Sequence, residues 1–194
     1  MLFGRAQMIR FLFWCRRSTR IGLAPSLLFS SNVRGMKAKF GSVRSTSRLF
    51  MVERTYNIVL DTNVLIAAAR SPKGASFRLI ELLGEKRFEI HISVALVLEY
   101  EEVLRREATP EMWADRDVDI FLDYLVAVAH WHKTPFNWRP MLRDPDDDFL
   151  LEIAVAAGVD CIVTHNVKDF SEAVSFGIEV LKPREFLRRV EDQL

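Results

Sequence analysis

Two short apolar runs, each followed by polar side chains, limit the possible folds of this chain more than any other feature. The first run covers residues 57–60 and is followed by Asp61, and the second covers residues 161–164 and is followed by His165. Short runs rich in β-branched residues are typical of buried strands. In an open parallel α/β sheet, ligands bind at the carboxyl ends of the strands. The two runs therefore predict polar side chains gathered at one edge of a sheet.

Predicted helices and strands alternate along the chain after residue 50. Strands are expected at 57–60, 88–92, 161–164 and 178–181, with a short one at 130–134. Helices are expected at 64–69, 76–83, 93–106, 117–129, 147–157 and 184–190. This alternation is typical of a parallel sheet between layers of helices. The predicted fold is therefore α/β, with three layers and a central, mainly parallel sheet of four to five strands.

Charge divides the chain into two parts. Residues 1–50 contain ten of the 27 Lys and Arg residues and no Asp or Glu. The rest of the chain carries the other 17 basic residues and all 26 acidic ones, a formal charge of −9. We expect residues 1–54 to be a basic leader or extension, and residues 55–192 to form one domain of ordinary size.

Three interpretations of the basic leader remain open. Its Arg and Ser content resembles a mitochondrial transit peptide, and its apolar patch at residues 11–14 is too short to span a bilayer. The favoured interpretation is that translation begins at Met51 and that the leader is a start-site misassignment or a disordered segment. The third is a basic arm that binds nucleic acid. Cys15 and Cys161 form no metal-ligand spacing, and two such distant cysteines do not suggest a disulfide scaffold, so a reducing compartment is expected. A cytoplasmic location and no membrane partner are also expected.

Acidic residues occur where predicted strands and helices end. Asp61 follows the first strand, Glu99 borders the apolar face of a helix, and Asp169 follows the strand at 161–164. Taken singly, Asp61 could simply cap a helix, and Glu99 could be a solvated charge. Carboxylates that converge repel one another unless a cation lies among them. Together they predict a site for a hard metal ion.

The densest acidic cluster is Asp144-Pro145-Asp146-Asp147-Asp148. The dipole at a helix start explains one such acid, but four exceed the need for capping. Asp144 and Asp147 are favoured as functional residues, because Asp147 shares a helical face with the apolar residues that follow. Asp148 is the second choice.

Polar neighbours could orient these carboxylates. Thr62 and Asn63 follow Asp61, and their hydroxyl and amide groups could hold its side chain. His165 is interpreted as a polar loop residue rather than a general base, and Lys168 as a solvated charge.

Four segments, taken in order, resemble the PIN-domain nucleases. They are Leu60-Asp61-Thr62-Asn63-Val64-Leu65, Ser93-x5-Glu99-Tyr100, Asp144-Pro145-Asp146-Asp147 and Ile162-Val163-Thr164-x-Asn166-x2-Asp169-Phe170. The resemblance covers residues 57 to about 190 and is specific as a set. The chain is most similar in character to the toxin components of bacterial PIN-type toxin–antitoxin modules.

The resemblance implies a PIN-like fold and an Mg²⁺- or Mn²⁺-dependent endoribonuclease that hydrolyses phosphodiester bonds of single-stranded RNA. The implied catalytic acids and metal ligands are Asp61, Glu99, Asp147 and Asp169, with Asp144 and Asp148 as further metal candidates. The supporting residues are Thr62, Asn63 and Asn166. Candidates for RNA contact are Arg70, Lys73, Arg143 and Lys168. Many family members carry Asp at the position of Asn166, which leaves the fourth ligand open.

The resemblance also implies two protein partners, an antitoxin and a second copy of the chain. Large aromatic residues could anchor a homodimer: Trp113, Trp131, Phe136 and Trp138. Two other functions stay open. One is an inactive PIN scaffold that binds RNA or protein, and the other is a phosphatase of the aspartyl-phosphate type, which Asn63 disfavours because that class needs Asp there.

Overall fold

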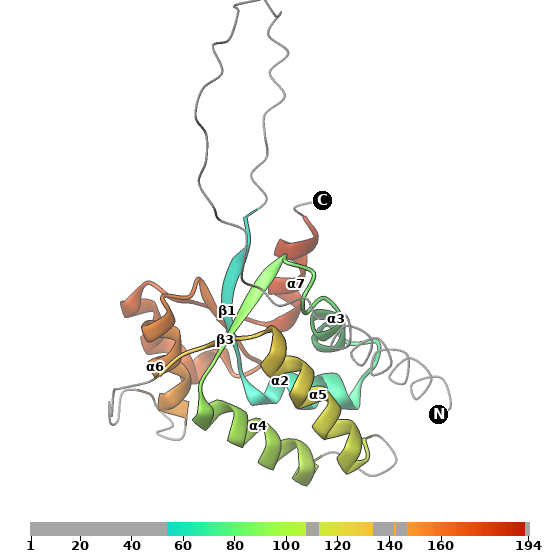
Figure 1. Ribbon diagram of the computed structural model, residues 1–194. Helices are drawn as coiled ribbons and strands as arrows, with labels where there is room; N and C mark the ends of the chain where they lie inside the picture. Colours follow the sequence, from blue (N-terminus) through green and yellow to red (C-terminus); the bar gives the residue numbers. More distant parts are fainter. Residues whose placement is uncertain (1–53, 108–112, 134–141, 143–146, 193–194) are drawn as a thin grey trace, which may run out of the picture.

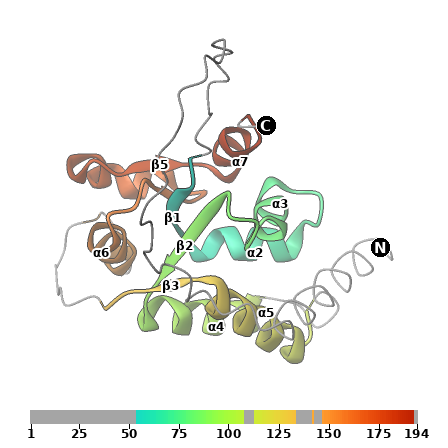
Figure 2. The same ribbon diagram turned by 45° about the horizontal axis from the view of Figure 1, so that its top comes forward.

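The central feature of the fold is a five-stranded sheet with helices on both faces (Figures 1 and 2). The computed structural model describes residues 54–107, 113–133, 142 and 147–192. In this part of the chain the strand order is β3-β2-β1-β4-β5, and every pairing is parallel. The predicted three-layer α/β fold is therefore confirmed. No described helix is long and apolar enough to cross a membrane.

The elements lie within a few residues of their predicted positions. The strands are β1 (Tyr56–Leu60), β2 (Phe88–Ile92), β3 (His130–Trp131), β4 (Cys161–Val163) and β5 (Glu179–Leu181). The α-helices are α2 (Thr62–Arg70), α3 (Ala75–Glu81), α4 (Val94–Glu107), α5 (Asp115–Val128), α6 (Asp148–Ala157) and α7 (Pro183–Glu191).

Strand β1 lies in the middle of the sheet, between β2 and β4. Ile58 pairs with Ile90 on one side and with Cys161 on the other. A strand that is covered on both faces needs apolar side chains at consecutive positions. This explains the uninterrupted apolar run, and it places the next residue, Asp61, at the carboxyl edge of the sheet.

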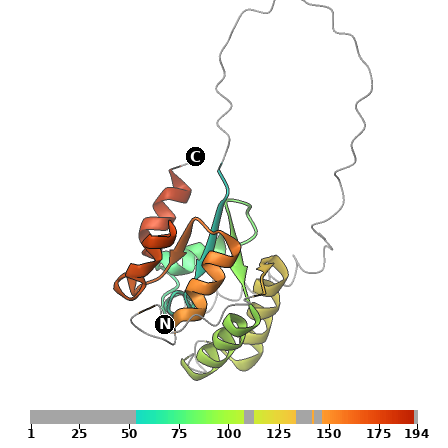
Figure 3. The ribbon, with the colours of Figure 1, turned by 90° about the vertical axis from the view of Figure 1, so that its left-hand side faces the viewer.

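Helices bury the two faces of the sheet separately. On one face, the rings of Tyr56 and Phe88 meet Phe186 of α7 edge-to-face, with centroids 5.7 and 5.4 Å apart. Helix α2 packs against α3 and α4, and α3 packs against α7. Helix α6 packs against β1 and β2 on the opposite side of the sheet from α2 and α3 (Figures 2 and 3).

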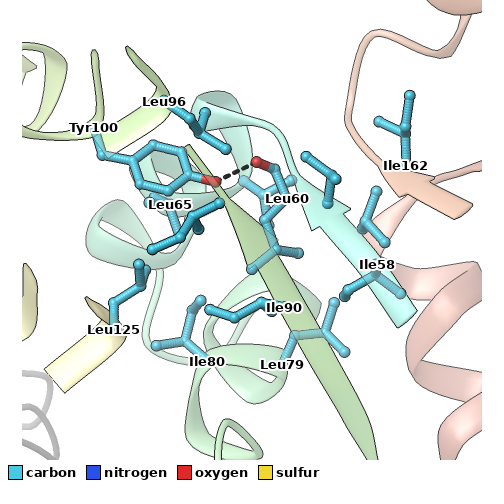
Figure 4. Close-up of a cluster of buried hydrophobic side chains, with 14 of the residues drawn as sticks. Ile58, Leu60, Leu65, Leu79, Ile80, Ile90, Leu96, Tyr100, Leu125 and Ile162 are labelled. Atoms are coloured by element: carbon cyan, nitrogen blue, oxygen red, sulfur yellow. Dashed lines mark hydrogen bonds between the residues drawn. The ribbon is translucent and has the colours of Figure 1, made fainter. Parts of the chain in front are cut away.

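A buried cluster ties α4 to the end of β1 (Figure 4). Leu96 and Tyr100 of α4 are almost completely buried, and the Tyr100 hydroxyl donates a hydrogen bond to the carbonyl oxygen of Leu60. The bond satisfies a polar group inside the core, and its acceptor is the residue directly before Asp61. Helix α4 is therefore attached next to the start of the predicted site.

One segment forms an element that the sequence pattern does not predict. No helix is expected between the strands at 161–164 and 178–181, but Val167–Phe176 forms 3₁₀ turns, here η2, with non-helical backbone angles at Phe170. Gly177 ends the segment with a positive φ of 75°. Short 3₁₀ pieces have no sustained hydrophobic period, which is why the sequence pattern does not reveal them.

Candidate functional site

Asp61 is held at the carboxyl end of β1 by donors from its own turn. Its side chain is buried, with 5% of the residue exposed. The backbone N–H of Asn63 donates to Oδ1 at 3.1 Å, and the Asn63 amide Nδ2 donates to Oδ2 at 2.6 Å. Asp61 is thus the N-cap of α2, so the capping interpretation is correct, and Asn63 orients the same carboxylate.

Thr164 connects Asp61 to the neighbouring strand. The Thr164 hydroxyl donates to Asp61 Oδ2, and it accepts from Asn63 Nδ2 at 3.1 Å and from the Asn166 backbone N–H at 2.9 Å. The backbone N–H of His165 donates to Asn63 Oδ1 at 3.1 Å. Sequence reasoning did not select Thr164 as a site residue. Its signal was a hydroxyl at the end of an apolar strand that pairs with β1.

Glu99 reaches the same edge from α4. The Thr62 hydroxyl donates to Glu99 Oε1 at 2.6 Å, and the Glu99 side chain is half-buried. Ser93 fixes the start of α4, since its Oγ accepts the Leu96 backbone N–H at 3.3 Å. Thr62 therefore holds Glu99 in the way that Asn63 holds Asp61.

Three of the predicted acids line one groove. Asp61, Glu99 and Asp147 border a groove of about 640 Å³, together with Asn63 and Asn166. Asp147 is the N-cap residue of α6, so three different parts of the chain contribute a carboxylate to the border of this groove.

The other predicted acids lie elsewhere. Asp148 is buried, and its Oδ1 accepts the Leu142 backbone N–H at 2.7 Å, so it holds the chain before α6. Asp169 lines a neighbouring pocket of about 460 Å³ that shares His165 and Asn166 with the groove. Asp144 lies outside the described residues.

The predicted RNA contacts also differ in their surroundings. Arg70 lines the groove but forms an ion pair with Glu107 at 2.7 Å. Lys73 is exposed in the turn between α2 and α3, and Lys168 is exposed in the neighbouring pocket. Arg143 lies outside the described residues.

The electrostatics of the groove favour a cation. Burial raises the pKa of Asp61, and the hydrogen bonds from Thr164 and Asn63 and the nearby His165 oppose this shift only in part. Burial also raises the pKa of Tyr100, as do the nearby Asp61 and Glu99, so its phenol stays protonated as a donor. A bound cation would offset the cost of keeping the Asp61 carboxylate charged.

The donor set fits a hard divalent ion that keeps part of its water shell. Within the described residues, no three His, Cys, Asp or Glu side chains stand close enough together to form a complete metal cage. Mg²⁺ is usually held by one or two carboxylates and several waters, so such a cage is not required. Asp61, Glu99 and Asp147 supply the carboxylate oxygens that this ion prefers.

Comparison with known proteins agrees with the geometry. A family model described as PIN domain matches residues 57–168, from β1 to the start of η2. No curated protein gives a significant match. PIN domains are generally metal-dependent nucleases. The match spans more than half of the chain and includes Asp61, Glu99 and Asp147, and the chain therefore belongs to the PIN-domain family.

Proposed function

We propose that this protein is an endoribonuclease that uses Mg²⁺ or Mn²⁺ to hydrolyse phosphodiester bonds in single-stranded RNA. The observation that carries the proposal is the groove that Asp61, Glu99 and Asp147 border from three different elements. Membership in a family of nucleases supports the same conclusion.

The residues of the groove have separable roles in this proposal. Asp61 and Glu99 would hold the cation, and Asp147 borders the same groove from the start of α6. Thr164 and Asn63 keep the Asp61 carboxylate in one orientation, and Thr62 does so for Glu99. When bound, the cation supplies an acidified water and neutralises charge on the phosphate. Asn166 borders both the groove and the pocket of Asp169, where its side chain can orient the RNA strand.

Cleavage of an RNA pool tests the function directly. The full chain is incubated with mixed single-stranded RNA and Mg²⁺, and the cut ends are mapped, with EDTA as the metal-free arm. We expect cleavage that stops with EDTA and with Asp61→Asn. Asp115→Asn removes an acid whose side chain is 89% exposed and outside the groove, so this control should cleave normally.

The same assay separates the alternatives. RNA binding without cleavage in Mg²⁺ or Mn²⁺ would indicate an inactive PIN scaffold. Release of phosphate from a phosphomonoester, with intact RNA, would indicate a phosphatase. Equal RNA cleavage by Asp61→Asn and the unmodified chain would refute the assigned groove.

We further propose that the protein acts as the toxin of a toxin–antitoxin pair and that it forms a homodimer. Apolar side chains exposed on α4 and β3 support a protein-binding surface: Val94 (63% exposed), Leu98 (59%) and Trp131 (49%). Trp113 packs edge-to-face on Phe121 in the core, so it is a poor interface anchor. Phe136 and Trp138 lie outside the described residues.

Light scattering at micromolar concentration would measure the oligomeric state, and a monomer mass would contradict the dimer.

A further inference from the structure

Two exposed lysines, Lys168 and Lys182, line a pocket beside the groove. Ion pairs hold many of its arginines, as in the pair of Arg70 with Glu107 at the groove. Lys168 and Lys182 form no ion pair with any described residue, and both are exposed. Together they line the pocket of about 460 Å³. The pocket therefore offers two ammonium groups that no described carboxylate neutralises by direct contact.

The sheet topology places this pocket next to the groove, where an RNA strand bound in the groove would continue. Lys168 follows β4 and Lys182 directly follows β5, and these two strands pair in parallel. Their carboxyl ends lie at the edge of the sheet that also holds Asp61. His165 and Asn166 border both the pocket and the groove. An RNA strand that leaves the groove past His165 and Asn166 would therefore reach the two lysines.

The acids of the pocket do not form salt bridges with the lysines. The Glu185 carboxylate accepts the Lys182 backbone N–H at 3.0 Å, which uses it to stabilise the start of α7. Asp169 is half-buried and makes no ion pair with Lys168 or Lys182. Flexible ammonium groups of this kind suit phosphates as point charges.

We propose that Lys168 and Lys182 form a binding subsite for backbone phosphates of the RNA strand, next to the bond that is cut at Asp61. This inference rests on the proposed nuclease function. The subsite holds the strand by charge and does not read its bases, because lysine contacts to phosphate carry no sequence information. It also explains how an acidic domain can hold RNA beside a carboxylate groove.

Salt-dependent RNA binding tests the subsite without cleavage. Fluorescence anisotropy follows a labelled single-stranded RNA in Mg²⁺, with the full-length Asp61→Asn chain as the parent. Lys168→Gln, Lys182→Gln and the double substitution are then compared with it. Lys133→Gln is the matched control. This exposed lysine follows β3, which is the edge strand farthest from β5 in the sheet.

We expect each pocket substitution to reduce the slope of log affinity against log salt by about 0.7, and the double substitution by about 1.4. Between about 50 and 200 mM salt, the parent should then lose about 2.5-fold more affinity than either single variant. Lys133→Gln should keep the parent slope. An unchanged slope in the double variant, an equal change in Lys133→Gln, or a parent that binds no RNA would each overturn the subsite.

Cleavage by the chain with Asp61 intact is measured separately. If this chain binds RNA through the two lysines but does not cut it, the subsite stands and the proposed nuclease function fails. If it cuts RNA with the same KM after both lysines are replaced, the function stands and the subsite fails.

Discussion

At the scale of single residues, the arrangement of the groove depends on one hydroxyl. Thr164 is completely buried, and its Oγ1 meets three partners from two strand ends. A hydroxyl has one proton to donate, and Asp61 takes it, so the other two contacts use its lone pairs. The orientation of Asp61 is therefore decided by a residue that is more than 100 positions away in the sequence.

Thr164→Val should weaken catalysis more than it weakens folding. Valine has nearly the same shape but cannot donate to Asp61 or accept from Asn63 and Asn166. We expect RNA cleavage to fall about 10- to 100-fold, as is typical when a residue that orients a metal ligand is lost. Unfolding free energy should fall by about 1–3 kcal/mol, because the buried Asp61 carboxylate loses a hydrogen-bond donor. Thr164→Ser keeps the hydroxyl and should restore most of the cleavage; loss of cleavage in this variant would contradict the assignment.

Asp147 and Asp148 should have different roles although they are adjacent. Asp147 lines the groove, so Asp147→Asn should reduce cleavage and leave urea stability nearly unchanged. Asp148 is buried and accepts a hydrogen bond from the Leu142 backbone N–H. Asp148→Ala should therefore lower the unfolding free energy by about 1–3 kcal/mol. Cleavage rates and urea titrations of both variants decide the matter. A larger loss of cleavage rate per folded molecule in Asp148→Ala would reverse the assignment.

At the scale of elements, β2 and β3 are joined by a histidine cluster. His91 is buried on β2, with Nε2 3.0 Å from Asn57 Oδ1 and Nδ1 2.7 Å from His132 Nε2. The rings of His91 and His130 stack with centroids 5.2 Å apart. The Asn57 oxygen accepts from Nε2–H of His91, so in the neutral form of His91 its Nδ1 accepts from Nε2–H of His132. Burial beside two other imidazole rings disfavours a charged His91.

This cluster predicts a loss of stability in mild acid. Burial, with the nearby His132 and His130, lowers the pKa of His91 from 6.5 to about 4. The unfolded chain therefore binds the proton first, so the stabilisation is complete above pH 6.5 and is lost as the pH falls towards 4. The shift corresponds to at most about 3 kcal/mol, and to about 1–2 kcal/mol when partial hydration of the cluster is considered. Urea titrations at pH 7 and pH 5 measure it. The same pH dependence in His91→Gln would show that His91 is not the cause.

At the scale of the whole molecule, the chain combines an acidic domain with a basic N-terminal segment. The buried core of the described residues extends from Ile58 in β1 to Val190 in α7. The ten basic residues of the first 50 therefore precede the first strand of this core. Charge and sequence pattern both assign them to a separate part of the chain.

Deletion of residues 1–50 should leave the domain folded and active. The expected change in melting temperature is below about 4 °C, which corresponds to less than about 1 kcal/mol for a domain of this size. Thermal unfolding and RNA cleavage at saturating Mg²⁺ measure the outcome. Deletion through Leu60 removes the central strand and should abolish folding, which makes it the control. A large fall in melting temperature on the shorter deletion would mean that the segment belongs to the fold, and a large loss of RNA affinity alone would support a basic arm.

The sequence by itself determined the layers of the fold and the place of Asp61. A central parallel strand needs a continuous apolar run, and residues 57–60 and 161–164 both satisfy this local requirement. Caps are equally local, so Ser93 before α4 and Gly158 after α6 were predictable from short patterns. The carboxyl edge of the sheet was therefore predictable, together with most of the acids that could reach it.

The tertiary structure alone decided which polar groups meet at that edge. Asp61 with Thr164, and Thr62 with Glu99, are contacts between distant segments, and no local pattern determines their distance. The sequence favours Asp147 over Asp148 only by helical face, whereas packing buries Asp148, which accepts a backbone N–H, and places Asp147 at the groove. Asp169 lies in the 3₁₀ turns of η2, which have no sequence period, and it lines the pocket next to the groove. Helices and strands depend on the order of neighbouring residues, whereas the site depends on contacts between residues that are far apart in the sequence.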